Sequence, residues 1–250
     1  MILNLYKARG ETPLQCLERF RNTNPEYKEA KMSYLGRLDP MADGVLLIAT
    51  DSDTSQTRRE EIFGLDKDYD FSALLGFATD TYDCLGKITH TGSVDHLSEM
   101  DLIKLCNIYE GERDQKYPKY SSPMISIILS PSPSQGEGLG VRSKKITIYK
   151  MQFKKLHQLS GKELFGRLLM DIGKVRGDFR QVEILELWQR NLKDSDREYF
   201  VANFSASVSS GTYIRSIVND LGETLGIGAC ALSITRTRVG NYLLKDSIRF

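Results

Sequence analysis

The sequence lacks the features that mark membrane-spanning and secreted proteins. Its apolar runs, such as residues 45–49, are far shorter than the roughly 20 residues that a membrane helix needs. The N-terminal stretch MILNLYKARG does not combine a basic start with a long apolar segment and a small-residue cleavage site, so it does not resemble a secretory signal. We therefore expect a cytoplasmic protein.

The sequence is also poor in potential metal ligands. Its 4 cysteines are far apart, show no CxxC spacing and have no cluster formed by the 3 histidines beside them. This pattern argues against a structural zinc site. We expect Cys16, Cys84, Cys106 and Cys230 to be reduced and mostly buried thiols, because cysteine packs as a small hydrophobic residue.

Glycine and proline are too scarce for a fibrous or generally disordered chain, with 20 and 7 among 250 residues. The length suits one large domain or two small ones. The 34 basic side chains nearly balance the 33 acidic ones, which leaves a net charge of +1. This balance does not decide for or against nucleic acid binding, because one face of a protein can be basic while the rest is acidic.

Local patterns predict helices and strands in alternation. Thr12, Pro13 and Gln15 form the N-terminal signature of a helix that reaches about residue 22. The run at 45–49 is typical of a buried strand. Residues 67–76 alternate apolar and polar side chains and predict a half-buried strand.

Further along the chain, a helix is expected over residues 98–111, opened by Ser98, with Leu102, Ile103 and Cys106 facing inward. Helices are also expected over 162–174 and 179–190, and a strand over 200–208. A last helix follows the SSGT turn and ends at Gly226, as helix C-termini prefer. We predict a mixed α/β (α+β) fold with a largely antiparallel central sheet and flanking helices.

Two neighbouring segments stand out by composition. Residues 130–142, SPSPSQGEGLGVR, offer almost nothing to bury, and we interpret them as a flexible insertion. Residues 142–155 carry only basic charges, from Arg142, Lys144, Lys145, Lys150, Lys154 and Lys155. The basic run is either a solvated face or a surface that contacts phosphates.

Three residues are candidates for chemistry. Asp39 precedes Pro40 in the GRLDP loop, so its carboxylate is either a turn former or a group presented from a stiff loop. Arg215 lies in the first turn of the last helix, where it can hold a carboxylate or remain on the surface. Tyr69 shares a face with Phe71, and spacing does not distinguish a core side chain from a stacking platform.

Four segments together resemble the TruB family of tRNA pseudouridine synthases. GRLDPMADGVLLIA, DKDYDF with LGFATDTYDCLG, and SSGTYIRSIVNDLGETLGIGA with RTRVG look like its three signature blocks, in the same order. The early KARGETPLQ is similar to the N-terminal motif of that family. Three ordered matches of this length are more specific than one short motif.

The resemblance implies a role for each matching residue. Asp39 would be the catalytic carboxylate, Tyr69 would stack on the target base, and Arg215 would pair with Asp39. Asp83 matches an acidic residue of this network and Lys7 a lysine near the site. The wider set of expected substrate-binding residues is Lys7, Tyr34, Asp83, Ile234, Lys144, Lys145 and Lys150.

The activity implied by the resemblance is isomerisation of uridine to pseudouridine at position 55 in the T arm of tRNA, with no cofactor or metal. A carboxylate can serve this reaction by covalent attack or by taking a ribose proton, and both routes stay open. The target base must leave its stack, as in other base-flipping enzymes. RNA recognition by loop shape then needs no base-reading code.

The chain departs from the family pattern at several positions. Tyr34 aligns with a histidine that many bacterial members have before GxLDP, and Ala8 follows Lys7 where Lys-Pro is usual. YSSPM and the low-complexity stretch replace a segment that usually carries lysine. Longer members continue into a C-terminal PUA domain, and we expect residues 1–250 to form a single catalytic domain without it, acting as a monomer.

Two other functions are compatible with some of these residues. One is a non-catalytic RNA-binding or RNA-chaperone protein with the same fold, although such a protein would not need Asp39, Tyr69 and Arg215 together. The other is an unrelated carboxylate enzyme such as a glycosidase, which requires a second positioned acid. Asp83 is the candidate for that acid.

Overall fold

The computed structural model of the chain describes residues 1–118, 120, 143–192 and 197–250. The predicted flexible insertion at 130–142 lies outside these residues. Among the described residues, no helix has both the length and the apolar character needed to cross a membrane. The 4 cysteines, Cys16, Cys84, Cys106 and Cys230, are free and buried, as the sequence predicts.

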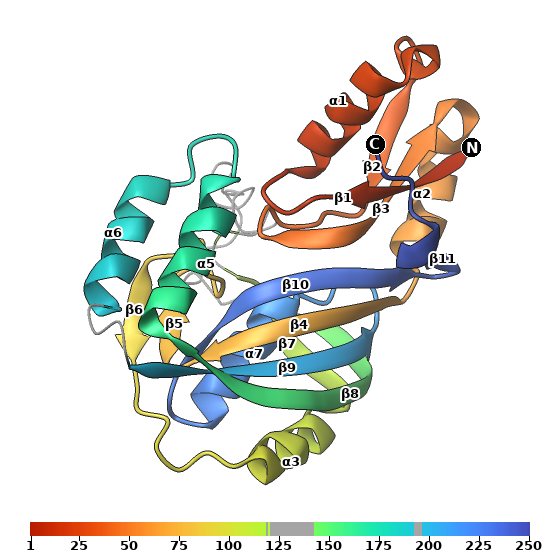
Figure 1. Ribbon diagram of the computed structural model, residues 1–250. Helices are drawn as coiled ribbons and strands as arrows, with labels where there is room; N and C mark the ends of the chain where they lie inside the picture. Colours follow the sequence, from red (N-terminus) through yellow and green to blue (C-terminus); the bar gives the residue numbers. More distant parts are fainter. Residues whose placement is uncertain (119, 121–142, 193–196) are drawn as a thin grey trace, which may run out of the picture.

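The chain alternates between strands and helices (Figure 1). The strands are β1 (Ile2–Lys7), β2 (Met32–Leu35), β3 (Ala42–Thr50), β4 (Lys67–Leu75), β5 (Phe77–Thr79), β6 (Ile88–Thr91), β7 (Gly111–Lys116), β8 (Ser143–Ser160), β9 (Glu198–Val208), β10 (Ala229–Val239) and β11 (Tyr242–Leu243). The helices are α1 (Pro13–Thr23), α2 (Gln56–Phe63), α3 (Glu99–Tyr109), α5 (Gly161–Gly173), α6 (Gln181–Asn191) and α7 (Ile214–Thr224). Short 3₁₀ turns cover Pro25–Tyr27, Asp51–Thr54 and Leu244–Asp246.

One nine-stranded sheet organises the described part of the chain, in the order β1-β3-β10-β4-β9-β8-β7. β2 pairs with β3 and β11 with β10 at its sides. β10 runs parallel to β3, and the other pairs in this sheet are antiparallel. The predicted mixed α/β fold with a largely antiparallel sheet is therefore confirmed.

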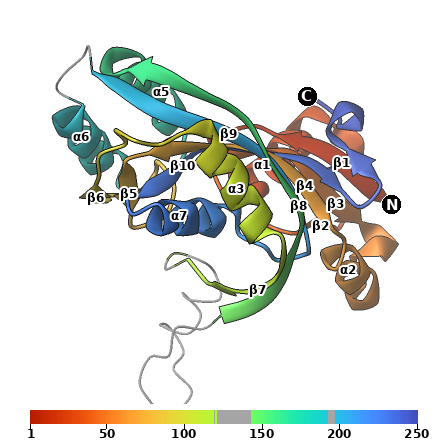
Figure 2. The ribbon, with the colours of Figure 1, turned by 90° about the horizontal axis from the view of Figure 1, so that it is seen from below.

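Helices pack on both faces of the central strands (Figure 2). We call the side that carries Tyr69 and Phe71 the α7 face, because α7 and α3 cover it and share its apolar core. The opposite side is the α5 face. There α5 and α6 cover one end and bury Trp188 completely.

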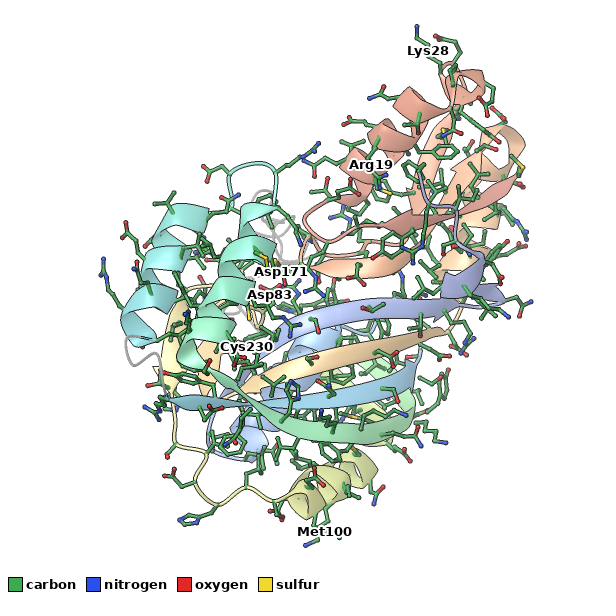
Figure 3. All side chains as sticks on the ribbon, in the orientation of Figure 1. Arg19, Lys28, Asp83, Met100, Asp171 and Cys230 are labelled. Carbon is green, nitrogen blue, oxygen red and sulfur yellow. The ribbon has the colours of Figure 1, made fainter. Side chains whose placement is uncertain are left out.

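The first three strands form a lobe with α1 and α2 at one end of the sheet, where both chain termini also lie (Figure 1). Lys28 in this lobe and Met100 in α3 mark opposite ends of the molecule (Figure 3). β3 connects the lobe to the rest of the sheet through the pairs that Ala42–Gly44 make with Ile234–Arg236. The loop that contains Asp39 lies just before this junction.

Most local predictions are confirmed. Thr12 and Gln15 form both hydrogen bonds of a capping box at the start of α1. Ser98 caps α3, but the inward position of Ile103 is wrong, because this side chain is 41% exposed. Leu105 is buried instead, since the helix turns the stripe of Leu102, Leu105, Cys106 and Tyr109 toward the sheet.

Candidate active site

Asp39 is held by a loop whose backbone is fixed at several points. The N–H of Ala42 donates to the carbonyl oxygen of Asp39 at 3.0 Å, and the N–H of Gly10 donates to that of Pro40 at 2.8 Å. Gly36, with φ +80, makes the turn that leads into this loop. The carboxylate of Asp39 is therefore presented from a well-supported segment rather than from a free loop.

Two buried cations support the same loop through its carbonyl groups. Lys7, which is fully buried, donates from Nζ to the carbonyl oxygens of Ala8, Glu11 and Ala42. Burial lowers the pKa of Lys7 to about 8. On the other side of the loop, Arg236 donates from Nη1 to the carbonyl oxygen of Arg37 at 3.1 Å.

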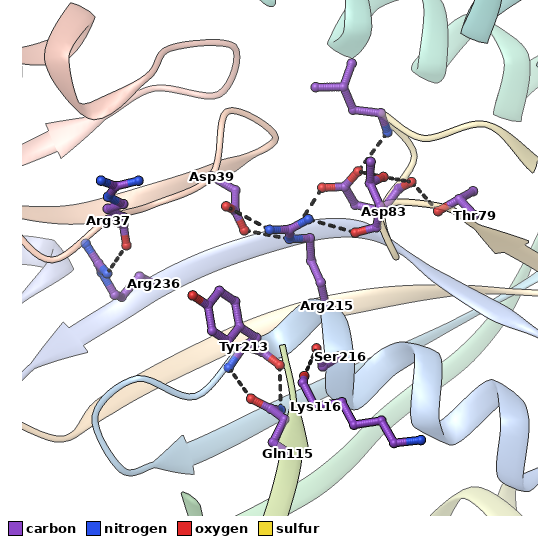
Figure 4. Close-up of polar contacts among 12 residues, drawn as sticks. Arg37, Asp39, Thr79, Asp83, Gln115, Lys116, Tyr213, Arg215, Ser216 and Arg236 are labelled. Atoms are coloured by element: carbon purple, nitrogen blue, oxygen red, sulfur yellow. Dashed lines mark hydrogen bonds and ion pairs between the residues drawn. The ribbon is translucent and has the colours of Figure 1, made fainter. Parts of the chain in front are cut away.

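Arg215 lies in the first turn of α7, as predicted, and is almost completely buried. The start of α7 is fixed by Gln115 of β7, which accepts a hydrogen bond from the backbone N–H of Tyr213 and donates one to its carbonyl oxygen. The hydroxyl of Ser216 donates to the carbonyl oxygen of Lys116. These contacts, shown in Figure 4, fix where the guanidinium emerges.

Asp39 and Arg215 meet in a bidentate ion pair. Nε of Arg215 lies 2.7 Å from Oδ2 of Asp39, and Nη2 lies 3.1 Å from Oδ1. The side chain of Arg215 is 6% exposed and that of Asp39 is 35% exposed. The carboxylate is thus held from the protein side while part of it stays open to a ligand (Figure 4).

Asp83 is the second acid of this network. Its Oδ2 lies 3.7 Å from Nε of Arg215, and its Oδ1 accepts hydrogen bonds from the hydroxyl of Thr81 and the N–H of Leu85. Burial raises the pKa of Asp83, and the charge of Asp39 raises it further, while Arg215 opposes both. Asp83 lies in the interior of the molecule, where Figure 3 labels it, and its side chain is only 7% exposed.

Arg215 contacts Asp39, Asp83 and Thr81 and so connects the members of this network. Its Nη1 donates to the carbonyl oxygen of Thr81 at 2.7 Å, so all three nitrogens of the guanidinium have partners. Burial alone would lower the pKa of Arg215, but the negative charges of Asp39 and Asp83 outweigh it and the pKa is raised. Arg215 therefore stays charged beside Asp39.

A cavity of about 500 Å³ opens beside Asp39 on the α7 face. Tyr69 and Ile234 contribute to its wall, together with Tyr213 and Ile214 at the start of α7. Tyr69 also belongs to the apolar core and is 7% exposed. Both interpretations of Tyr69 are thus compatible with its position, because the residue belongs to the core and also lines the cavity.

Some predicted site residues lie away from this cavity. Tyr34 in β2 packs against the apolar cluster around α1 and does not line the cavity. Lys144 donates from Nζ to the carbonyl oxygen of Ser210, a cavity residue. Lys150 pairs with Ser207 and so points to the α5 face, as does Lys145 by alternation with the buried Ile146. The structure thus separates the lysines of the basic run.

Sequence reasoning missed several residues of the site. Thr81, Gln115, Tyr213 and Arg236 hold Arg215 or the loop of Asp39 in place, yet none was a candidate. Tyr213 and Arg236 lie inside the segments that carry the resemblance, so their place in these motifs was a usable signal. Gln115 had none, because an isolated glutamine on a polar strand looks like a surface residue.

The arrangement supports acid–base or nucleophilic chemistry on a ligand that binds in this cavity beside Asp39. The carboxyl group of Asp39 faces a cavity whose wall has aromatic, aliphatic and cationic side chains, and a buried guanidinium fixes its orientation. Among the residues that the structure describes, no group of three or more His, Cys, Asp or Glu side chains is placed to hold a metal ion.

The chain is similar in sequence to a known protein family and to its curated members. Residues 24–165 match the TruB family pseudouridylate synthase (N terminal domain). The tRNA pseudouridine synthase B of Mycoplasma mobile is 29% identical over 247 residues, which cover 99% of this chain and 71% of that protein. The enzyme of the same name from Clostridium tetani is 27% identical and is covered to 70%.

Solved structures agree with the fold. The chain in a crystal structure of a Cbf5-Nop10-Gar1 complex superimposes with a TM-score of 0.59 at 18% identity over 97% of this chain. A chain in an H/ACA RNP bound to a substrate RNA containing 2′-deoxyuridine superimposes with a TM-score of 0.55. The present chain spans about half the length of these two, 49% and 48%.

Proposed function

The chain belongs to the TruB family of pseudouridylate synthases and is a tRNA pseudouridine synthase, and from this premise we propose that it isomerises uridine 55 in the T arm of tRNA with Asp39 as the catalytic carboxylate. The observation that carries the proposal is the bidentate pair of Asp39 with the buried Arg215 at the edge of a cavity that Tyr69 and Ile234 line.

The reaction needs few components. It breaks the N1–C1′ bond of uridine, forms a C5–C1′ bond and moves a proton from C5 to N1, so atoms and electrons balance without a co-reactant. Asp39 serves either by attacking the nucleotide or by taking a ribose proton. In both routes it must be ionised and correctly oriented, and Arg215 provides both conditions.

The released base must stay in the site until it has turned and formed the new bond. We propose that Tyr69 stacks on it and that Ile234 covers part of the opposite surface. Base–aromatic stacking contributes about 1–3 kcal/mol, which offsets the few kcal/mol needed to take a base out of its stack. This balance is more favourable for a base in a loop than for one in a helix, which fits a target in the T arm.

The remaining site residues, Asp83 and Lys7, position Arg215 and the loop of Asp39. We propose that Asp83 orients Arg215 and that Lys7 orients the loop of Asp39, because each is buried and contacts the element it would position. Since Asp39, Tyr69 and Arg215 come from one chain, we propose that a monomer is sufficient. We also propose that residues 1–250 form one catalytic domain, because one sheet connects both ends of the described chain.

The test is Asp39→Asn, assayed for pseudouridine on a T-arm stem-loop. We expect loss of product with RNA binding and folding nearly unchanged, because the amide keeps the shape but cannot act as base or nucleophile. The matched control is Asp68→Asn. Asp68 also forms a bidentate pair with an arginine, Arg238, and its side chain is also 35% exposed, but the α5 face carries it.

Asp68→Asn should retain full activity. Substantial pseudouridine formation by Asp39→Asn would remove Asp39 from its proposed role. If the unaltered chain bound the stem-loop but formed no pseudouridine even at high protein concentration, the non-catalytic alternative would replace the proposal.

A further inference from the structure

Phe63 is an aromatic residue whose position core packing does not explain. It ends α2, a short helix that packs on β3 and β10 through Ile62. Phe63 itself is 39% exposed and belongs to none of the apolar clusters of the described residues. It lines the same cavity as Asp39 and Tyr69. An exposed aromatic side chain in a cavity wall is a surface on which a flat ligand can stack.

The backbone of Phe63 is fixed although its ring is exposed. Its carbonyl oxygen accepts hydrogen bonds from Nζ of Lys67, at 3.1 Å, and from the hydroxyl of Ser210. The guanidinium of Arg59 lies 5.9 Å from the centre of the ring. Hydrogen bonds to its backbone therefore hold Phe63 at the cavity wall, and substitutions of the side chain leave these bonds in place and change only the contact with Arg59.

This end of the cavity is positively charged. Lys67 and Arg236 are both buried and line the cavity, and their hydrogen bonds go to carbonyl and hydroxyl oxygens rather than to carboxylates. Burial and the neighbouring charge of Arg236 lower the pKa of Lys67 to about 8. Arg37, which is exposed, adds a third cation to the lining. The potential favours an anion here. Figure 4 shows Arg37 and Arg236 side by side, apart from Asp39 and Arg215.

We propose that the part of the cavity lined by Phe63, Arg37 and Ser210 is a second nucleotide subsite, which binds the nucleotide next to the target uridine with its base on Phe63 and its phosphate toward the cationic end. This inference rests on the proposed function. Two adjacent nucleotides match the chemistry of this lining. The target base lies beside Asp39, and the neighbouring base and its phosphate meet Phe63 and the cations.

The experiment pairs protein variants with altered RNAs. T-arm stem-loops are made with an abasic nucleotide on the 5′ side or on the 3′ side of the target uridine. Their dissociation constants and single-turnover rates are measured with the unaltered chain, Phe63→Ala, Phe63→Leu and Phe63→Trp. Met100→Ala, an exposed apolar residue at the far end of the molecule, is the control (Figure 3).

We expect one of the two abasic RNAs to bind the unaltered chain more weakly by about fivefold to 150-fold, the range of one base–aromatic stack. Phe63→Ala and Phe63→Leu should weaken binding of the intact RNA and abolish the difference between intact and abasic RNA. Phe63→Trp and Met100→Ala should preserve it. The side on which the coupling appears identifies the bound neighbour.

Equal losses in the unaltered chain and in Phe63→Ala, on both sides of the target, would overturn the subsite. This outcome differs from failure of the proposed function, because the unaltered chain would still form pseudouridine in the same assay. Thermal unfolding of each variant controls for folding. If Phe63→Ala failed to fold, the comparison of Phe63→Leu with Phe63→Trp would carry the same test.

Discussion

Arg215 holds both carboxylate oxygens of Asp39 with a side chain that is 6% exposed, while the side chain of Asp39 is 35% exposed. The more deeply buried partner is the cation, which also touches Asp83 and the carbonyl oxygen of Thr81. Orientation of Asp39 is therefore set from inside the protein, and the outer side of the carboxylate stays open to substrate.

Arg215→Lys should retain the charge but lose the geometry. A lysine ammonium cannot bind both oxygens of Asp39 and also reach Thr81 in the way that a planar guanidinium does. We expect kcat for pseudouridine formation to fall about 100-fold with a much smaller change in KM, because a misplacement of this kind mainly affects the chemical step. Arg238→Lys, in the matching pair with Asp68, is the control and should leave kcat unchanged. An equal effect of the two variants would contradict this role.

Arg236→Gln tests the support of the Asp39 loop. The variant loses the charge and shortens the reach to the carbonyl oxygens of Arg37 and Val45, which lie in or beside that loop. We expect the free energy of unfolding to fall by about 1–3 kcal/mol, because buried carbonyl groups lose a hydrogen-bond partner. We also expect a decrease in kcat that Arg236→Lys partly restores. If Arg236→Gln lowered stability without changing kcat, Arg236 would be a structural residue only.

Lys144→Ala should account for most of the RNA-binding effect of the basic run. Lys144 contacts Ser210 at the cavity, whereas Lys145 and Lys150 point to the α5 face. We expect Lys144→Ala to weaken binding and to reduce the slope of log K against log salt by about 1. Lys145→Ala and Lys150→Ala test in the same salt titration whether the α5 face contributes to RNA binding. A larger slope change in those two variants would show that RNA also covers the α5 face.

Asp220→Asn should change the pH dependence of stability. Burial, with the nearby charge of Glu223, raises the pKa of Asp220 from 3.8 to about 6. Because the folded pKa exceeds the unfolded one, the stability linked to Asp220 is present below pH 3.8 and is lost as the pH rises through 6. The asparagine variant should therefore match the unaltered chain near pH 3 and be more stable above pH 7. The shift corresponds to about 3 kcal/mol, and because Asp220 is partly exposed we expect about 1–2 kcal/mol of it. Urea unfolding at the two pH values checks this, and equal stabilities above pH 7 would contradict it.

The sequence predicted those elements whose signals are local. Thr12 and Gln15 mark the start of α1 within four residues, and Gly226 marks the end of α7. β10 was not predicted, because its first half is apolar at nearly every position and its second half polar, so no alternation with period two appears. A prediction based on alternation with period two therefore cannot detect β10, the central strand of the site.

The candidate site was predicted through motifs rather than through periodicity. Asp39, Tyr69 and Ile234 do line one cavity, and Arg215 binds Asp39 from behind it, although their separation in the sequence gives no hint of this. The sequence does not show which face of the sheet Lys145 and Lys150 occupy. Bulges in β8 interrupt the regular alternation of its side chains between the two faces. Phe63 was missed because the helix that carries it, α2, was not predicted from the sequence.

The position of β10 between β3 and β4 has a consequence for biosynthesis. Residues 229–239 complete the middle of the sheet, and they pair with the strand that follows Asp39. A nascent chain on the ribosome therefore lacks its central strand until residues 229–239 have been synthesised. We therefore expect a growing chain to modify RNA only after residues 229–239 have left the ribosome and joined the sheet.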